Sequence, residues 1–313
     1  MIAALERPAP SSAITEWTPQ PIAIVLAVAL AAGYVYALRR AEASLPRWRI
    51  AVFGLGIAVL VWTSCGFLAG YANSLYWVWT TQTLLLWLVV PILILSGHPV
   101  QLARQLPAVG AHVDTVLRNP ICRVIGNPLV GPALVPVLSF VFFFGPLPEW
   151  AARATWFAWL LQLALLLIGA LMVLPLAGLD EEATSLAVGL SLAIGCFELV
   201  LDALPGVVLR LRNSLVTGWF DYRDVHSWTP DALRDQRVAG AILWCIAEII
   251  DLPFLVLVYR RWLRADARDA AEVDAVLDAE RAARQAMPET EPDRDAPWWL
   301  SDPTMQERLR RRE

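Results

Sequence analysis

Apolar blocks of about 20 residues dominate the sequence, and that is the length an α-helix needs to cross the hydrocarbon core of a membrane. Because no water reaches that core, a spanning segment must satisfy its backbone N–H and C=O groups internally, which favours helices. The fold class predicted is therefore an all-α polytopic membrane protein, a bundle of seven transmembrane helices. The predicted spans are 21–38, 50–72, 75–96, 127–147, 154–178, 184–208 and 236–260.

Composition agrees with a membrane protein and disfavours other classes. The chain is 58% hydrophobic with a mean hydropathy of +0.53, whereas soluble domains average about 45–50% apolar residues. A formal net charge of −4 argues against a nucleic-acid partner. The sequence shows neither a phosphate-binding loop nor a nucleophile–base pattern, so we expect no enzyme activity.

Arginine distribution predicts the orientation, because basic loops stay on the cytoplasmic side. Three regions that fall on one side of a seven-span bundle are basic, which places the N-terminus outside and the C-terminus in the cytoplasm. These regions contain Arg39, Arg40, Arg47 and Arg49, then Arg104, Arg118 and Arg123, then Arg260, Arg261 and Arg264. The segment 209–235 disagrees, since it is also basic but is placed outside.

The domain organisation follows from the same pattern. Residues 1–20 form an N-terminal segment, residues 21–263 the membrane domain, and residues 264–313 a charged cytoplasmic tail. The first part of the tail is predicted to extend the last helix into water. After residue 288, a composition rich in Pro, Asp, Glu and Arg predicts disorder.

Two polar features lie inside the predicted spans, where ionisable groups are costly and often functional. Thr80, Thr81, Gln82 and Thr83 occupy the start of the third span, within "YWVWTTQTLLLWLVVPILILSGHP". Carboxylates occur in the last two spans, one helical turn apart in each, at Glu198 and Asp202 and at Glu248 and Asp251. The threonines and the glutamine could be interhelical hydrogen-bonding groups. The acids could be structural, or could form the pathway of a proton or cation transporter.

Four stretches in order resemble the CtaG-like family of cytochrome c oxidase assembly proteins. They are "SCGFLAGYANSLYWVWTTQTLLLWLVVPILILSGHPVQLARQL", "FFFGPLPEW", "GALMVLPLAGLDEE" and "WTPDALRDQRVAGAILWCIAEI". Asp235, Gln236 and Gly240 match the motif with which the family opens its last span. The resemblance covers almost the whole chain and implies a membrane-embedded factor that assists oxidase biogenesis. Its expected partners are membrane lipid and an oxidase subunit or another assembly factor.

The resemblance also implies a history of copper handling, because the family is associated with assembly of the oxidase copper centre through helical histidines. This chain departs from that pattern. Its three histidines, His98, His112 and His226, lie elsewhere. The positions that match the family's metal site read Trp79, Gln82, Thr83, Ala158 and Gln162.

We therefore predict a degenerate copper site and action by protein contact, without a resident cofactor. One alternative is a thiol-based copper-binding assembly factor, in which Cys65, Cys196 and Cys245 would bind soft Cu(I). The other alternative is the proton or cation transporter.

The arginine distribution generates the first testable prediction. A reporter fused to the N-terminus should be active only outside the plasma membrane, and one fused to the C-terminus only in the cytoplasm. A C-terminal reporter that is active only in the periplasm would disprove the seven-span topology.

Overall fold

The structure is a computed structural model that describes residues 6–40, 45–106, 130–174 and 185–286, together with isolated positions between 109 and 119 and at 297 and 302. Within these ranges every regular element is helical. In chain order they are α1 (Ser12–Thr15), α2 (Pro21–Arg40), α3 (Arg47–Cys65), α4 (Phe67–Tyr71), α5 (Tyr76–Leu84), the π-helical turn η1 (Leu85–Val89), α6 (Val90–Ser96), α7 (Pro99–Arg104), α10 (Val130–Phe144), α11 (Leu147–Arg153), α12 (Thr155–Val173), α13 (Ser185–Leu211), the 3₁₀ turn η3 (Gly218–Asp221) and α14 (Ala232–Ala286).

The chain is a multi-pass membrane protein. Four helical stretches in the described ranges are long and apolar enough to cross a membrane, at Pro21–Arg40, Arg47–Tyr71, Tyr76–Ser96 and Thr155–Val173. A fifth is added if a bent pair, Leu134–Phe144 and Leu147–Arg153, forms one span. Helices α13 and α14 cover the sixth and seventh predicted spans, while the count of seven and the orientation of the termini remain predictions.

Helix α10 covers most of the fourth predicted span, 127–147, and a bend at its end separates it from α11. The chain bends by 45° between α10 and α11. The bend falls at Gly145–Pro146, and Pro148 follows in the first turn of α11. Proline cannot donate a backbone hydrogen bond and disfavours helical geometry in the residue before it, so the helix ends and restarts at a new angle.

The third predicted span contains a π-helical turn, η1, that joins α5 to α6. In this turn the Val90 N–H bonds to the Leu85 carbonyl, one residue further back than in an α-helix. Pro91 follows and has no N–H to offer the Trp87 carbonyl. That carbonyl oxygen instead faces Gly169 of α12 at very close range. Helix α12 can approach the widened turn because residue 169 has no side chain.

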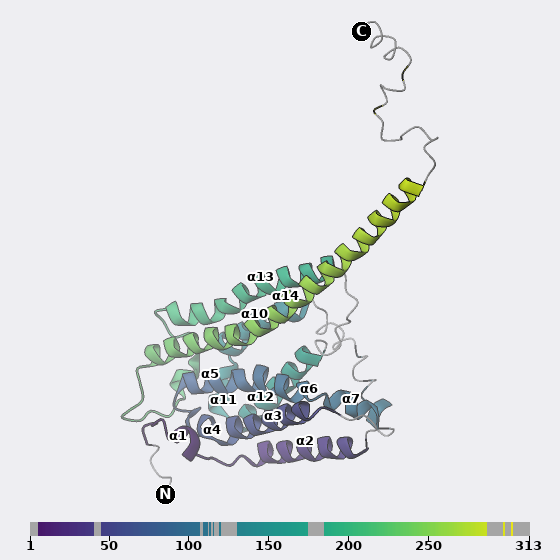
Figure 1. The fold of residues 1–313 in the computed structure, drawn as a ribbon. Helices are drawn as coiled ribbons and strands as arrows, with labels where there is room; N and C mark the ends of the chain where they lie inside the picture. The colour runs from purple at the N-terminus through teal and green to yellow at the C-terminus, as the bar shows by residue number, and fades with distance from the viewer. Residues whose placement is uncertain are drawn as a thin grey trace.

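The last two long helices, α13 and α14, pack along one another (Figure 1). Gly206 meets the backbone of Gly240 and Trp244 at one end of the contact, and Gly195 meets Leu255 further along. Figure 1 shows the second half of α14 leaving the bundle. Residues 272–284 of this extension are exposed.

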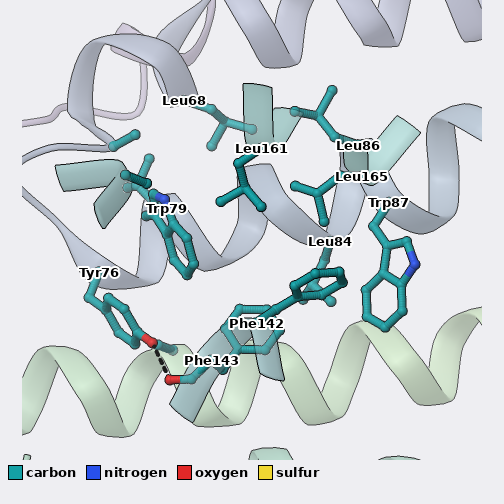
Figure 2. Packing of buried hydrophobic residues seen from close by; sticks show 14 of the residues in the cluster. Leu68, Tyr76, Trp79, Leu84, Leu86, Trp87, Phe142, Phe143, Leu161 and Leu165 are labelled. Carbon is teal, nitrogen blue, oxygen red and sulfur yellow. Dashed lines mark hydrogen bonds between the residues drawn. The ribbon is translucent and has the colours of Figure 1, made fainter. Parts of the chain in front are cut away.

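A large aromatic and aliphatic cluster fills the bundle around α5 and η1 (Figure 2). Tyr76, Trp87 and Phe143 are completely buried in it. The Trp87 ring meets Phe142 edge to face at a centroid distance of 5.0 Å. This packing fixes the face that α5 presents to α10 and α12.

Gly169 provides a test of the contact between α12 and η1. Gly169→Ala should lower the free energy of unfolding by roughly 1–3 kcal/mol, because a methyl group there collides with the Trp87 backbone. Gly33→Ala on α2 is the matched control, since a Cβ at that position meets nothing. Thermal unfolding in one detergent measures both variants, and equal midpoints would contradict the proposed close packing.

Candidate functional site

A carboxylate from the far end of the sequence caps the N-terminus of α5. The Asp235 oxygens accept hydrogen bonds from the backbone N–H groups of Tyr76 at 2.8 Å and Trp77 at 3.1 Å. Leu75 is the local N-cap residue, and its side chain makes no capping bond. A helix leaves its first N–H groups without partners, and a negative charge there is favourable. Asp235 therefore fixes where α5 begins and how α14 meets it.

Arg223 is the counter-charge of this cap. Its guanidinium lies 3.6 Å from the Asp235 carboxylate, and both side chains are largely buried. Burial raises the pKa of the Asp235 carboxyl above its ordinary value, while the two N–H donors and Arg223 act in the opposite direction.

Gln236 holds the connection between α13 and α14. Its side-chain oxygen accepts from the Val216 N–H at 3.0 Å, and its amide nitrogen donates to the Ser214 carbonyl at 3.1 Å. Gly240 follows one turn later and allows the close approach of α13. The three motif residues Asp235, Gln236 and Gly240 thus join α14 to α5, to the loop before η3 and to α13.

Tyr76 links the capped end of α5 to α10. Its hydroxyl donates to the Phe143 carbonyl at 3.0 Å, one of the last carbonyls of α10 (Figure 2). Its ring stacks on Trp79 with a centroid distance of 5.5 Å and an interplanar angle of 14°. Trp79 in turn meets Phe143 edge to face at 5.8 Å. The Trp79 indole is therefore locked in position beside the next turn of α5.

A cavity of about 110 Å³ opens beside this turn. It is bordered by the end of α3, α4, α5, α11, α12 and η3. The residues that line it are Gln20, Ser64, Ala69, Ala72, Asn73, Trp79, Gln82, Thr83, Leu86, Ala151, Ala152, Thr155, Ala158, Trp159, Leu161, Gln162, Leu165 and Trp219. Asn73 and Thr155 are exposed at its rim, while Gln82, Thr83 and Trp219 are buried.

The N-terminal segment covers one side of the cavity through Gln20. Its backbone is tied to α3 and α4 by three bonds. The Thr18 N–H donates to the Cys65 carbonyl at 2.6 Å, the Trp62 indole to Ala13 at 2.9 Å, and the Tyr71 hydroxyl to Glu6 at 3.0 Å. The segment before α2 is therefore part of the site.

The cavity brings together all five positions that the resemblance assigns to a metal site. Trp79, Gln82 and Thr83 come from α5, and Ala158 and Gln162 from α12. The sequence missed Gln20, Ser64, Asn73 and Trp219, because these lie in turns and segment ends that have no periodic pattern.

The chemistry of the cavity is that of neutral hydrogen-bonding groups. Amides, hydroxyls and indoles line it, and none of the described lining residues carries an imidazole, thiol, thioether or carboxylate. Gln82 donates to the Thr63 carbonyl of α3 at 3.0 Å, so it does act as an interhelical hydrogen-bonding group. The buried Trp219 Nε1 has no hydrogen-bond partner among the described residues. These groups do not fit copper, which prefers imidazole, thiolate or thioether ligands.

Other candidate residues are dispersed. Cys65 is buried near the cavity, whereas Cys196 and Cys245 are exposed on α13 and α14. In the part of the chain that the structure describes, no three His, Cys, Asp or Glu side chains form a group suited to a metal ion. His98 and His226 lie outside the cavity lining, and His112 lies outside the described residues.

The four acids of the sixth and seventh predicted spans occupy matched levels of α13 and α14. Gly206 of α13 contacts Trp244 of the antiparallel helix α14. Asp202 lies one turn before Gly206 and Glu248 one turn after Trp244, so Asp202 and Glu248 lie at the same level along the two helices. The Gly195–Leu255 contact places Glu198 and Asp251 at a common level in the same way. Asp202 is buried, and Glu248 accepts a hydrogen bond from the Trp244 indole at 3.2 Å. The side chains of Glu198 and Asp251 lie outside the described residues.

The fold and the site define a multi-pass helical membrane protein with a polar cavity at one end of its bundle. The model of the family of cytochrome c oxidase caa3 assembly factors (Caa3_CtaG) matches residues 32–265. The chain belongs to this family, which confirms the resemblance found in the sequence.

Mycobacterial relatives share most of this chain. Uncharacterised proteins of Mycobacterium bovis and Mycobacterium tuberculosis are each 28% identical over 273 residues, covering 83% of this chain and 40% of theirs. A Mycobacterium leprae protein is 27% identical over 271 residues, with 82% and 40% covered. The chain thus spans about two fifths of the length of the curated relatives it matches. No solved structure matches it.

The Asp235 cap generates a prediction about stability. Asp235→Ala leaves two N–H groups of α5 without their acceptor, at a cost of about 1–3 kcal/mol for each group, and removes the counter-charge of the buried Arg223 guanidinium. Asp278→Ala removes an equivalent carboxylate from the exposed part of α14, where its pairing with Arg281 contributes little. The thermal unfolding midpoint should fall much further in Asp235→Ala than in Asp278→Ala. An unchanged midpoint in Asp235→Ala would contradict the capping role.

Proposed function

We propose that this chain is an assembly factor for cytochrome c oxidase in a bacterial inner membrane, and that it acts by contact with an oxidase subunit or another assembly factor. Family membership supports the role in oxidase assembly. The single observation that supports action without a copper site is the cavity, where amide, hydroxyl and indole groups occupy four of the five matching positions and Ala158 the fifth. No catalytic step is proposed.

The contact surface is proposed at the end of the bundle where α5 begins. Around the cavity rim, the Arg153 guanidinium lies 4.4 Å from the Tyr222 ring centroid and pairs with Glu149. The exposed indoles of Trp150 and Trp156 lie on either side of Arg153 in sequence. Exposed aromatic and arginine side chains are the residue types that most often anchor protein interfaces.

Depletion tests the role in assembly. Cells that lack this protein should contain less assembled cytochrome c oxidase, measured as haem absorbance and oxidase activity in isolated membranes. The full-length gene should restore both, and tagged protein in mild detergent should co-purify an oxidase subunit or another assembly factor. Normal oxidase levels in depleted cells would refute the proposal.

Copper retention tests the degenerate site. After loading with Cu(I) and washing with a competing chelator, the purified protein should retain far less than one equivalent, because the cavity lacks good copper ligands. Stoichiometric copper that disappears in a Cys196→Ser, Cys245→Ser variant would instead favour the thiol-based alternative.

Restoring imidazoles should create a copper site in the same cavity. Trp79→His with Thr83→His places two imidazoles one turn apart on the cavity face of α5. Trp77→His with Thr81→His is the matched control, with the same residue types and spacing on positions that do not line the cavity. Copper retained by the first variant and not by the second would support the inherited geometry, and equal retention would contradict it.

A further inference from the structure

We propose that the joined ends of α2, α3 and α7 bind the headgroup of an anionic phospholipid. The site consists of Arg39 and Arg40 at the end of α2 and Arg47 and Arg49 at the start of α3, and is called here the arginine end. It lies at the opposite end of the bundle from the Asp235 cap, because α5 and α6 run from Tyr76 at the cap towards Ser96 and α7.

Packing brings these arginines together. The Tyr34 and Phe53 rings of α2 and α3 stack at a centroid distance of 3.7 Å and an angle of 7°. The Tyr34 hydroxyl donates to the Gly97 carbonyl at 2.9 Å, and Leu102 of α7 is buried in the same cluster. These contacts hold the antiparallel helices α2 and α3 together at a level little more than one helical turn away from their arginines. They also hold α7 against both helices.

The segments that form the arginine end are strongly basic. Between Glu16 and Glu149 the sequence contains only two acidic residues, Glu42 and Asp114, and both lie outside the described residues. The described residues at the arginine end include no carboxylate that could neutralise the four guanidinium groups. Arginine bonds phosphate through two parallel N–H donors, so a phosphodiester is the natural counter-ion.

Arg49 shows the need for an acceptor most directly. Its side chain is half-buried, with the guanidinium carbon 5.3 Å from the Trp48 ring centroid. Its Nε is buried and has no hydrogen-bond acceptor among the described residues. A buried donor without an acceptor is costly, and a phosphate oxygen that enters between α2 and α3 would remove this cost.

The position of the arginine end selects a lipid over free phosphate. The spans Pro21–Arg40 and Arg47–Tyr71 both terminate here, which places the guanidinium groups in the headgroup layer. Trp48 is 58% exposed and Tyr36 is 54% exposed, with Arg40 5.6 Å from the Tyr36 ring centroid. Exposed aromatic rings beside arginines are typical of a membrane interface, where basic groups attract anionic lipids.

Lipid-dependent stability of the full chain tests the site. Protein purified in a neutral detergent is titrated with phosphatidylglycerol or with phosphatidylcholine at equal mole fractions, and the thermal unfolding midpoint is measured. Phosphatidylglycerol should raise the midpoint more than phosphatidylcholine, because a ligand that binds only the folded state stabilises it. In the variant with Arg39, Arg40, Arg47 and Arg49 all changed to Gln, most of this difference should disappear.

Two controls distinguish lipid binding at this site from a general effect of net charge and from binding of free phosphate. The matched variant changes the exposed Arg210, Arg212, Arg234 and Arg237 to Gln at the cap end, and it should keep the phosphatidylglycerol response. Inorganic phosphate should not reproduce that response. An equal loss in both variants, an equal effect of the two lipids, or full replacement by phosphate would overturn the proposal. If the four-fold variant does not fold, Arg39→Gln with Arg40→Gln should still lose a clear part of the response.

Discussion

The carboxylate of Asp235 is the interaction on which the arrangement of this bundle depends. It binds the first two N–H groups of α5 across a sequence separation of 159 residues, and it belongs to the first turn of α14. Through Tyr76 the same helix start is tied to the end of α10, and through Gln236 it is tied to the loop after α13. One short motif therefore fixes the positions of four helix ends.

The cavity is a consequence of this arrangement. The cap sets the rotation of α5, so that Trp79, Gln82 and Thr83 face α12 and the turn η3. Stacking of Trp79 on Tyr76 then holds the indole against the cavity. The five positions that the resemblance assigns to a metal site therefore share one cavity, and the side chains that line it are neutral. This chemistry agrees with the proposed action through protein contact.

Backbone packing at three glycines sets the remaining contacts. Gly169 accepts the Trp87 carbonyl at the π-helical turn, and the Gly206–Gly240 crossing brings α13 against α14. Lipid supplies no hydrophobic force between helices, so close backbone contact and hydrogen bonds must provide the specificity. The polar residues of the third span fit this account, since Gln82 bonds to α3 from within the helix.

Apolar periodicity in the sequence by itself determined the helical class and the approximate limits of most helices, because lipid permits few other structures. The motif around Asp235 and the polar face of the third span were also visible in the sequence, together with the absence of histidines there. Only the tertiary structure decided the bend at Gly145–Pro146 and the π-helical turn before Pro91, since proline permits a straight end, a kink or a widened turn. Tertiary structure alone also revealed that Asp235 caps α5 and that Trp219 borders the cavity. Contacts across such sequence distances depend on how the helices pack, which no local pattern encodes.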